Sequence, residues 1–179
     1  GIITALAGNG SVITLTILTE LLGLPGNIAN GTNRVGVFMN TIGALAGFSG
    51  KKEQEYKKYW PYILPVIIGA VFGTILATQV THDQFMGVFK IMMVVMLIII
   101  LVKPERWLIA QAGKSIMPRW LVWPVMLLIG FYGGFIQMGV GIFYLAVLVL
   151  VARLPMLESN KIKAVAVGSF TLVALLIFA

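Results

Sequence analysis

Long apolar stretches separated by short polar turns make up most of this chain. Residues 60–80, 84–102 and 120–152 are almost continuously apolar, and each stretch is longer than an ordinary strand. A strand of a membrane barrel would instead alternate inward and outward residues over about ten positions. The pattern therefore predicts an all-α fold, a polytopic bundle of transmembrane helices.

Polar turns divide the chain into predicted elements. Basic loops at 49–59 and 103–119 are two helices apart, so both are expected on one side of the membrane, which the positive-inside rule makes cytoplasmic. In chain order, we expect an apolar segment at 1–24, helices at about 28–48, 60–80 and 84–102, an apolar segment at 120–152, and a last helix from 160.

Two glycine-rich breaks interrupt the apolar segments. The first is Gly8-Asn9-Gly10, and the second is Gly139-Val140-Gly141. A straight helix over 120–152 would be about 50 Å long, against a hydrocarbon core of about 30 Å. We therefore expect two half-helices that meet at the second break, and both a crossing and a re-entrant second half fit the pattern. Unpaired backbone groups at such breaks must face protein or water.

The stretch around the first break recurs around the second. Residues 8–41 and 139–171 share a glycine break, an apolar run, a Leu-Pro turn and a helix that opens with asparagine. Asn30 matches Asn160 at an offset of 130, whereas Gly8 matches Gly139 at 131. We predict two homologous repeats, 1–102 and an incomplete 120–179, joined by a cytoplasmic basic linker at 103–119. With an even number of helices between them, the repeats should share one orientation.

Composition supports a membrane protein. The chain is 59% hydrophobic and 11% charged, with mean hydropathy +0.99, whereas soluble domains are about 25% charged. The net charge of +7 gathers in two loops rather than one stripe, so no nucleic-acid partner is expected. There is no cysteine and one histidine, which leaves a metal site without ligands. Both ends look cut, as in a fragment of a longer protein.

A polar stripe runs along the predicted helix at 28–48. At about 100° per residue, its members fall within about 120° of one face. An arginine near the membrane centre costs at least ~2.5–3.5 kcal/mol, so this stripe predicts a polar cavity. The alternative is that the arginine reaches outward to the headgroups. The stripe consists of Asn30, Asn33, Arg34, Asn40 and Thr41.

The second copy adds Asn160, Lys163 and Thr171 on an equivalent face. Lys163 is either a second cation in the cavity or an interfacial residue of the first helical turn. Half-helix N-termini at the breaks carry partial positive charge and bind anions, although the glycines could serve only close packing. The predicted site is an electropositive midplane pocket for an anion. Its predicted substrate-binding residues are Asn9, Gly10, Asn30, Asn33, Arg34, Gly139, Gly141, Asn160 and Lys163.

Catalysis finds little support in the sequence. Ser11 has no candidate base except the distant His82, which is more typical of a solvated turn. We therefore predict neither an enzyme nor a cofactor.

The segments just described resemble the sulfite exporter TauE/SafE family of membrane permeases. The resemblance rests on the glycine breaks, on Ala29-Asn30-Gly31-Thr32-Asn33-Arg34 and on the shorter echo from Asn160 to Ala164. It implies a multi-pass secondary transporter in the bacterial inner membrane that moves sulfur oxyanions or organosulfonates, such as sulfite, by alternating access. The family has about four helices per half, whereas the second half here ends after two.

The partners expected from this resemblance are a small anionic solute, the lipid bilayer and a coupling ion, either proton or sodium. Two alternatives stay open. One is a passive anion channel, and the other is a non-transporting membrane subunit or assembly factor.

Overall fold

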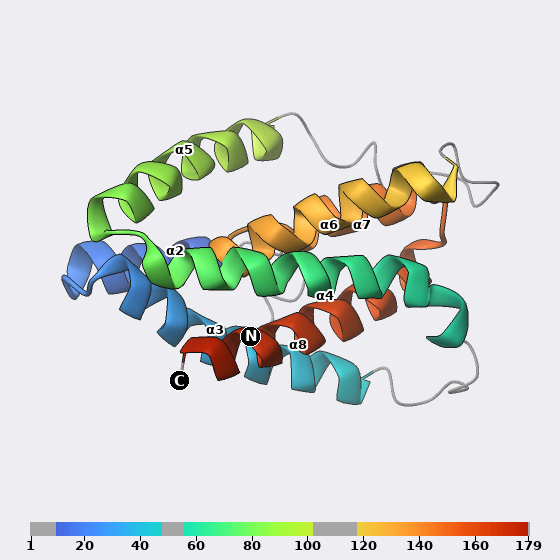
Figure 1. Cartoon of the computed structure of the whole chain (residues 1–179), viewed down its shortest axis with the longest axis horizontal. Helices are drawn as coiled ribbons and strands as arrows, with labels where there is room; N and C mark the ends of the chain where they lie inside the picture. Colours follow the sequence, from blue (N-terminus) through green and yellow to red (C-terminus); the bar gives the residue numbers. More distant parts are fainter. Residues whose placement is uncertain (1–9, 48–55, 102–117, 179) are drawn as a thin grey trace.

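The computed structural model describes residues 10–47, 56–101 and 118–178, and every element in these ranges is helical. The all-α prediction is confirmed for this part of the chain. The elements shown in Figure 1, with two π-helical segments named η, are α2 (Gly10–Thr16), η1 (Ile17–Leu21), α3 (Gly26–Gly47), α4 (Tyr56–Gln79), α5 (His82–Leu101), α6 (Arg119–Phe135), α7 (Val140–Ala146), η4 (Val147–Val151) and α8 (Met156–Phe178).

The last helix begins earlier than predicted. α8 starts at Met156 rather than at residue 160, because Pro155 precedes it and the Ser159 amide donates to the Pro155 carbonyl at 2.9 Å. Asn160 and Lys163 therefore lie about one and two turns inside the helix. The interfacial interpretation of Lys163, which needed a first-turn position, loses its basis.

The apolar stretch from residue 120 folds back on itself. α6 ends at Phe135, and Gln137 and Gly139 both adopt left-handed backbone conformations with φ of 59° and 67°. From there α7 and η4 return beside α6 (Figure 1). The Tyr144 hydroxyl donates to the Tyr62 carbonyl at 2.9 Å, near the start of α4. The second half-helix therefore returns instead of crossing.

This return reverses the expected orientation of the two copies. α3 and α8 run antiparallel (Figure 1), with Gly31 of α3 next to Phe178 and Thr41 next to Gly168. The prediction that the copies share one orientation is therefore wrong. An even number of helices between the copies required residues 120–152 to cross once, whereas α6 and α7 enter and leave at the same end (Figure 1).

Backbone features of α2 to α3 recur 130 residues later in α7 to α8. The seven-residue α2 and α7 each continue into a five-residue π-helical segment. A left-handed residue follows, Gly23 with φ of 63° and Arg153 with φ of 53°. The Leu24 amide bonds to Leu18 O at 3.0 Å, and the Leu154 amide bonds to Leu148 O at 3.0 Å. The first break at residues 8–9 lies outside the described residues.

Glycines bring α4 and α6 into direct backbone contact. These helices run parallel, and a Cβ atom at any of four glycines would lie 1.9–2.1 Å from a carbonyl oxygen of the partner helix. Only hydrogen atoms fit at such a distance, as in other small-residue contacts of membrane helices. The four residues are Gly69, Gly73, Gly130 and Gly134.

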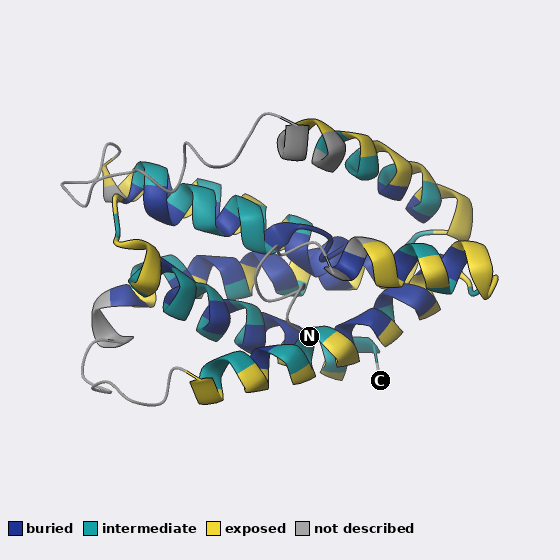
Figure 2. Cartoon of the chain, turned by 180° about the vertical axis from the view of Figure 1, so that it is seen from behind, coloured by how far each residue is buried: buried dark blue, intermediate teal, exposed yellow. Residues whose placement is uncertain are grey.

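Apolar surface covers much of the described structure. Tyr59–Gln79 and Met156–Phe178 are the two described helical spans that are long and apolar enough to cross a bilayer. Buried residues concentrate where α3, α4, α6, α7 and α8 meet (Figure 2). On α5, Ile91, Val94 and Ile98 are each more than half exposed, which fits a hydrocarbon environment.

We predict that Gly69→Ala destabilises the protein by about 1–3 kcal/mol, because the new methyl group overlaps Leu127 O and forces the helices apart. Gly87→Ala on α5 is the matched control, since nothing lies within 4 Å of its added Cβ. It should be neutral or stabilise by up to about 1 kcal/mol through helix propensity. Unfolding in detergent, followed by circular dichroism, checks both variants. Equal stability of the two would contradict the close contact.

Candidate functional site

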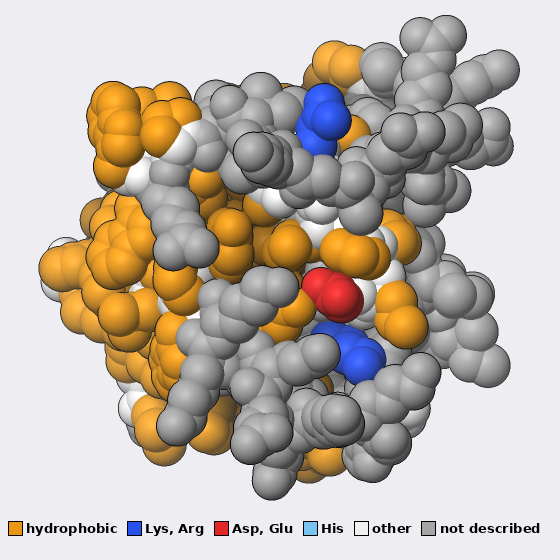
Figure 3. Space-filling model, turned by 90° about the vertical axis from the view of Figure 1, so that its right-hand side faces the viewer, with side chains coloured by type: hydrophobic (Ala, Val, Ile, Leu, Met, Phe, Trp, Pro, Cys, Tyr) orange, Lys and Arg blue, Asp and Glu red, His pale blue; other side chains and the backbone are white. Residues whose placement is uncertain are grey.

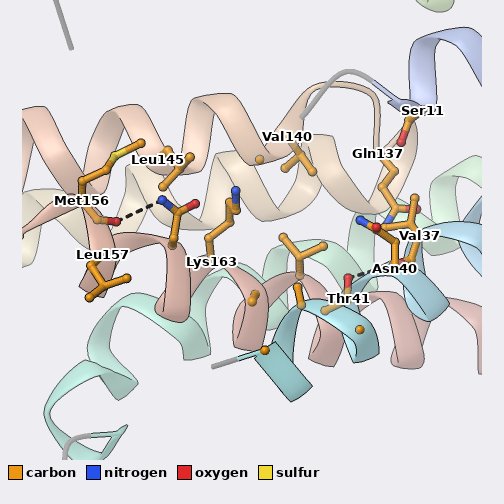
Figure 4. A pocket seen from close by; sticks show the side chains of 17 residues that line it. Ser11, Val37, Asn40, Thr41, Gln137, Val140, Leu145, Met156, Leu157 and Lys163 are labelled. Carbon is orange, nitrogen blue, oxygen red and sulfur yellow. Dashed lines mark hydrogen bonds between the residues drawn. The ribbon is translucent and has the colours of Figure 1, made fainter. Parts of the chain in front are cut away.

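A cavity of about 550 Å³ lies between α3, α7 and α8 (Figure 4). It extends from the end of α3 and the start of α8 to Ser11 at the start of α2 and Gln137 in the break. On each long helix the lining positions recur every three or four residues, which places them on one face. They include Val37, Asn40, Thr41 and Ala44 on α3, and Asn160, Lys163, Ala164 and Val167 on α8.

Among the described residues that line this cavity, Lys163 is the one with a charged side chain. Its ammonium group points into the cavity (Figure 4), and its stem passes Gly141, where an added Cβ would lie 3.5 Å from Lys163 Cδ. It forms no ion pair with a carboxylate in the described ranges. Glu158, which lies on the same helix, accepts the Tyr59 hydroxyl at 2.7 Å.

Gln137 forms the inner end of the cavity. Its side chain is 2% exposed, its Nε2 donates to Thr171 Oγ1 at 2.5 Å, and its Oε1 has no partner among the described residues. The left-handed backbone at Gln137 is uncommon for a residue with a side chain and is often found at functional sites. Sequence reasoning missed this residue. The available signal was a lone amide between Ile136 and Met138 in an apolar run at a glycine break.

A second polar group is buried beside the break. Arg34 is fully buried and donates through Nη2 to Gly134 O, which also accepts the Thr74 hydroxyl at 3.1 Å. Asn30 Nδ2 donates to Phe135 O at 2.7 Å. These side chains satisfy carbonyls at the C-terminal end of α6, where a cation also suits the helix dipole. The Arg34 guanidinium carbon lies 5.0 Å from the centre of the Phe178 ring.

The structure divides the predicted site residues into two groups. Gly141, Asn160 and Lys163 line the cavity, whereas Asn30, Asn33 and Arg34 are buried behind it. Gly10 is the first residue of α2, and Gly139 precedes α7 in its left-handed conformation. Asn9 lies outside the described residues.

One other polar residue has a structural explanation. His82 Nδ1 accepts the hydrogen bond from the Gly26 amide at 3.0 Å and so caps the start of α3, although the sequence suggested only a solvated turn.

In the described part of the chain, no three His, Cys, Asp or Glu side chains cluster to hold a metal ion.

Interrupted helices around a central cavity are typical of membrane transporters. The family model described as "Sulfite exporter TauE/SafE" matches residues 1–179, so the chain belongs to this family of membrane transporters. It is 26% identical to "Probable membrane transporter protein ORF9" of Sinorhizobium sp, over 89% of this chain and 60% of that protein. It is 23% identical to a probable membrane transporter protein of Xylella fastidiosa (strain Temecula1), over 97% of this chain and 67% of that protein.

A probable membrane transporter protein of Haemophilus influenzae is 25% identical over 78% of this chain and 54% of its own length. The chain thus spans roughly three fifths of the curated relatives it matches. No solved structure matches it significantly.

The equivalent residues Asn30 and Asn160 should differ in their effect on stability. Asn30→Ala should cost about 1–3 kcal/mol, because the buried Phe135 carbonyl then loses its donor. Asn160→Ala should stay within about 0.5 kcal/mol, since Asn160 Nδ2 bonds only to Met156 O of its own helix. Chemical unfolding in detergent measures both. A larger loss of stability for Asn160→Ala than for Asn30→Ala would contradict a structural role for the hydrogen bond from Asn30 to Phe135 O.

Proposed function

We propose that this protein is a polytopic secondary transporter of small anions, of the sulfur-oxyanion or organosulfonate class. The observation that carries the proposal is Lys163, a cation that lines a cavity of a membrane protein and has no carboxylate partner among the described residues. An ionisable side chain within a membrane-spanning helix is costly and generally marks a solute or ion pathway. Family membership, with sulfite export in its description, directs the choice of anion.

The cavity has the chemistry of an anion site. Lys163 supplies the charge, the Ser11 hydroxyl and the Asn160 and Gln137 amides line the same space, and none of the described lining residues is Asp or Glu. The first amides of a helix lack intrahelical acceptors, so the start of α7 at Val140 and Gly141 adds partial positive charge. Charge-assisted hydrogen bonds to the oxygens of sulfite or a sulfonate would hold the solute.

Two repeats, one inverted relative to the other, are part of the proposal. The shared backbone features at an offset of 130 and the antiparallel α3 and α8 support them. Repeats of opposite orientation are common in secondary transporters, where they exchange conformations during alternating access. The division into residues 1–102, 103–119 and 120–179 remains our proposal for the repeats and their linker.

The cavity approaches one end of the molecule. Gly47, Met156 and Leu157 line it, at the end of α3 and the start of α8, and α4 and α6 also start at this end (Figure 1). Described Lys, Arg and acidic side chains reach the surface here, whereas the flank of the molecule is hydrophobic (Figure 3). Since basic loops precede α4 and α6 in sequence, the positive-inside rule assigns this end to the cytoplasm. We infer an inward-facing transporter in the bacterial inner membrane.

The opposite half favours a transporter over a passive channel. Leu15, Phe85, Phe89, Phe135, Ile136 and Met138 belong to a buried apolar cluster next to Gln137, and we infer that this cluster closes the path. A channel needs a continuous path, whereas alternating access opens one side at a time. The coupling ion, proton or sodium, remains a prediction.

Lys163→Met should raise the apparent KM for sulfite uptake into proteoliposomes by roughly 10- to 150-fold. This corresponds to the loss of one charge-assisted hydrogen bond, about 1.5–3 kcal/mol. Lys161→Met is the matched control, because Lys161 lies on the same helix but does not line the cavity. Equal KM values for the two variants would remove Lys163 from the substrate site.

A further inference from the structure

Each residue of the cavity has a counterpart 130 positions away in the other copy. Asn33 is the counterpart of Lys163, Asn30 of Asn160, and Arg34 of Ala164. Asn160, Lys163 and Ala164 line the cavity. Their counterparts Asn30, Asn33 and Arg34 are only 0–2% exposed. These three side chains are therefore closed off in this structure, although Asn27 and Gly31 of the same helix line a separate cavity of about 560 Å³.

The closed region holds unsatisfied polar atoms. Among the described residues, five buried side-chain nitrogen or oxygen atoms have no hydrogen-bond partner, and four belong to this group. A buried donor or acceptor without a partner destabilises the fold, so a purely structural role does not explain this cluster. The four atoms are Asn30 Oδ1, Asn33 Nδ2, Arg34 Nε and Arg34 Nη1.

We propose that Arg34, Asn33 and Asn30 form a second anion subsite, which opens to the opposite side of the membrane when the Lys163 cavity closes. This inference rests on the proposed transport function and divides its substrate path into two subsites of opposite access. The guanidinium and the Asn33 amide offer three unpaired donors, which match the oxygens of a sulfite or sulfonate group. Arg34 forms no ion pair with a described carboxylate, so its charge remains available to an anion.

The contacts that hold this subsite closed identify what must change. Arg34 is bonded to Gly134 O, Asn30 to Phe135 O at 2.7 Å, and the guanidinium rests against Phe178 of α8. Opening separates α3 from the end of α6 and from the end of α8. Val37 of α3 and Val167 of α8 are counterparts of each other, and both line the present cavity. The two antiparallel helices therefore meet at equivalent positions, near the point about which the two conformations would interchange.

Cysteine accessibility tests this inference, because the chain contains no cysteine. Ala44 lines the cavity and its counterpart Ala174 is 0% exposed, so Ala44→Cys and Ala174→Cys are a matched pair. A membrane-impermeant maleimide is added to one side or the other of sealed vesicles that contain the protein. Ala44→Cys should react from the side of the basic loops, and Ala174→Cys from the opposite side only.

The ratio of the maleimide labelling rates of Ala174→Cys and Ala44→Cys should report the population of the conformation in which the Arg34 subsite is open. A minor conformation populated at about 0.1–10% makes Ala174→Cys react roughly 10- to 1,000-fold more slowly than Ala44→Cys. Leu145→Cys and Leu15→Cys form a second pair that reduces side-chain volume, in case the larger side chain at residue 174 disturbs folding. Here Leu15→Cys should react from the side opposite to Leu145→Cys.

Same-side labelling of both members in each pair would overturn the inference, as would complete protection of Ala174→Cys and Leu15→Cys in protein that transports sulfite. In either case the transporter assignment would stand. Absence of sulfite, sulfonate and sulfate uptake by the unmodified protein would instead refute the proposed function, whereas labelling from opposite sides would still support two alternating cavities.

Discussion

An interrupted helix inside a membrane must find partners for its free backbone groups within the protein, and this constraint organises the structure. The carbonyls at the end of α6 receive Arg34, Thr74 and Asn30, and the Tyr132 hydroxyl donates to Met138 O in the break itself. The bonds from Arg34 and Asn30 link α3 to the break, and the bond from Thr74 links α4 to it. They hold Gln137 and the start of α7 at the inner end of the cavity.

The return of α7 beside α6 follows from this break and has a wider consequence. Because this half-helix pair makes no crossing, α3 and α8 run antiparallel (Figure 1), as the proposed inverted repeats require. Inversion also separates polar residues that would otherwise share one pocket. Lys163 faces the open cavity, whereas Arg34 is enclosed behind the break, and neither side chain forms an ion pair with a described carboxylate.

Much of the helical architecture could be predicted from sequence, but its orientation could not. Glycine clusters marked the second break, and the periodicity of Asn30, Asn33 and Arg34 indicated the face of α3 that lies inside. Periodicity identifies a polar face without its partner, so the bond from Arg34 to a backbone carbonyl was not foreseeable. The length of residues 120–152 fits both a crossing and a return, and only packing of Tyr144 against α4 decides between them.

The most direct measurement is uptake of labelled sulfite, a sulfonate and sulfate by the protein reconstituted in liposomes. A transporter of this class should show saturable uptake of sulfite or the sulfonate that exceeds both sulfate uptake and uptake by empty liposomes. Uptake of none of these anions by correctly folded protein would contradict the proposed function. Flux that rises linearly with concentration, without saturation, would indicate a channel and contradict alternating access.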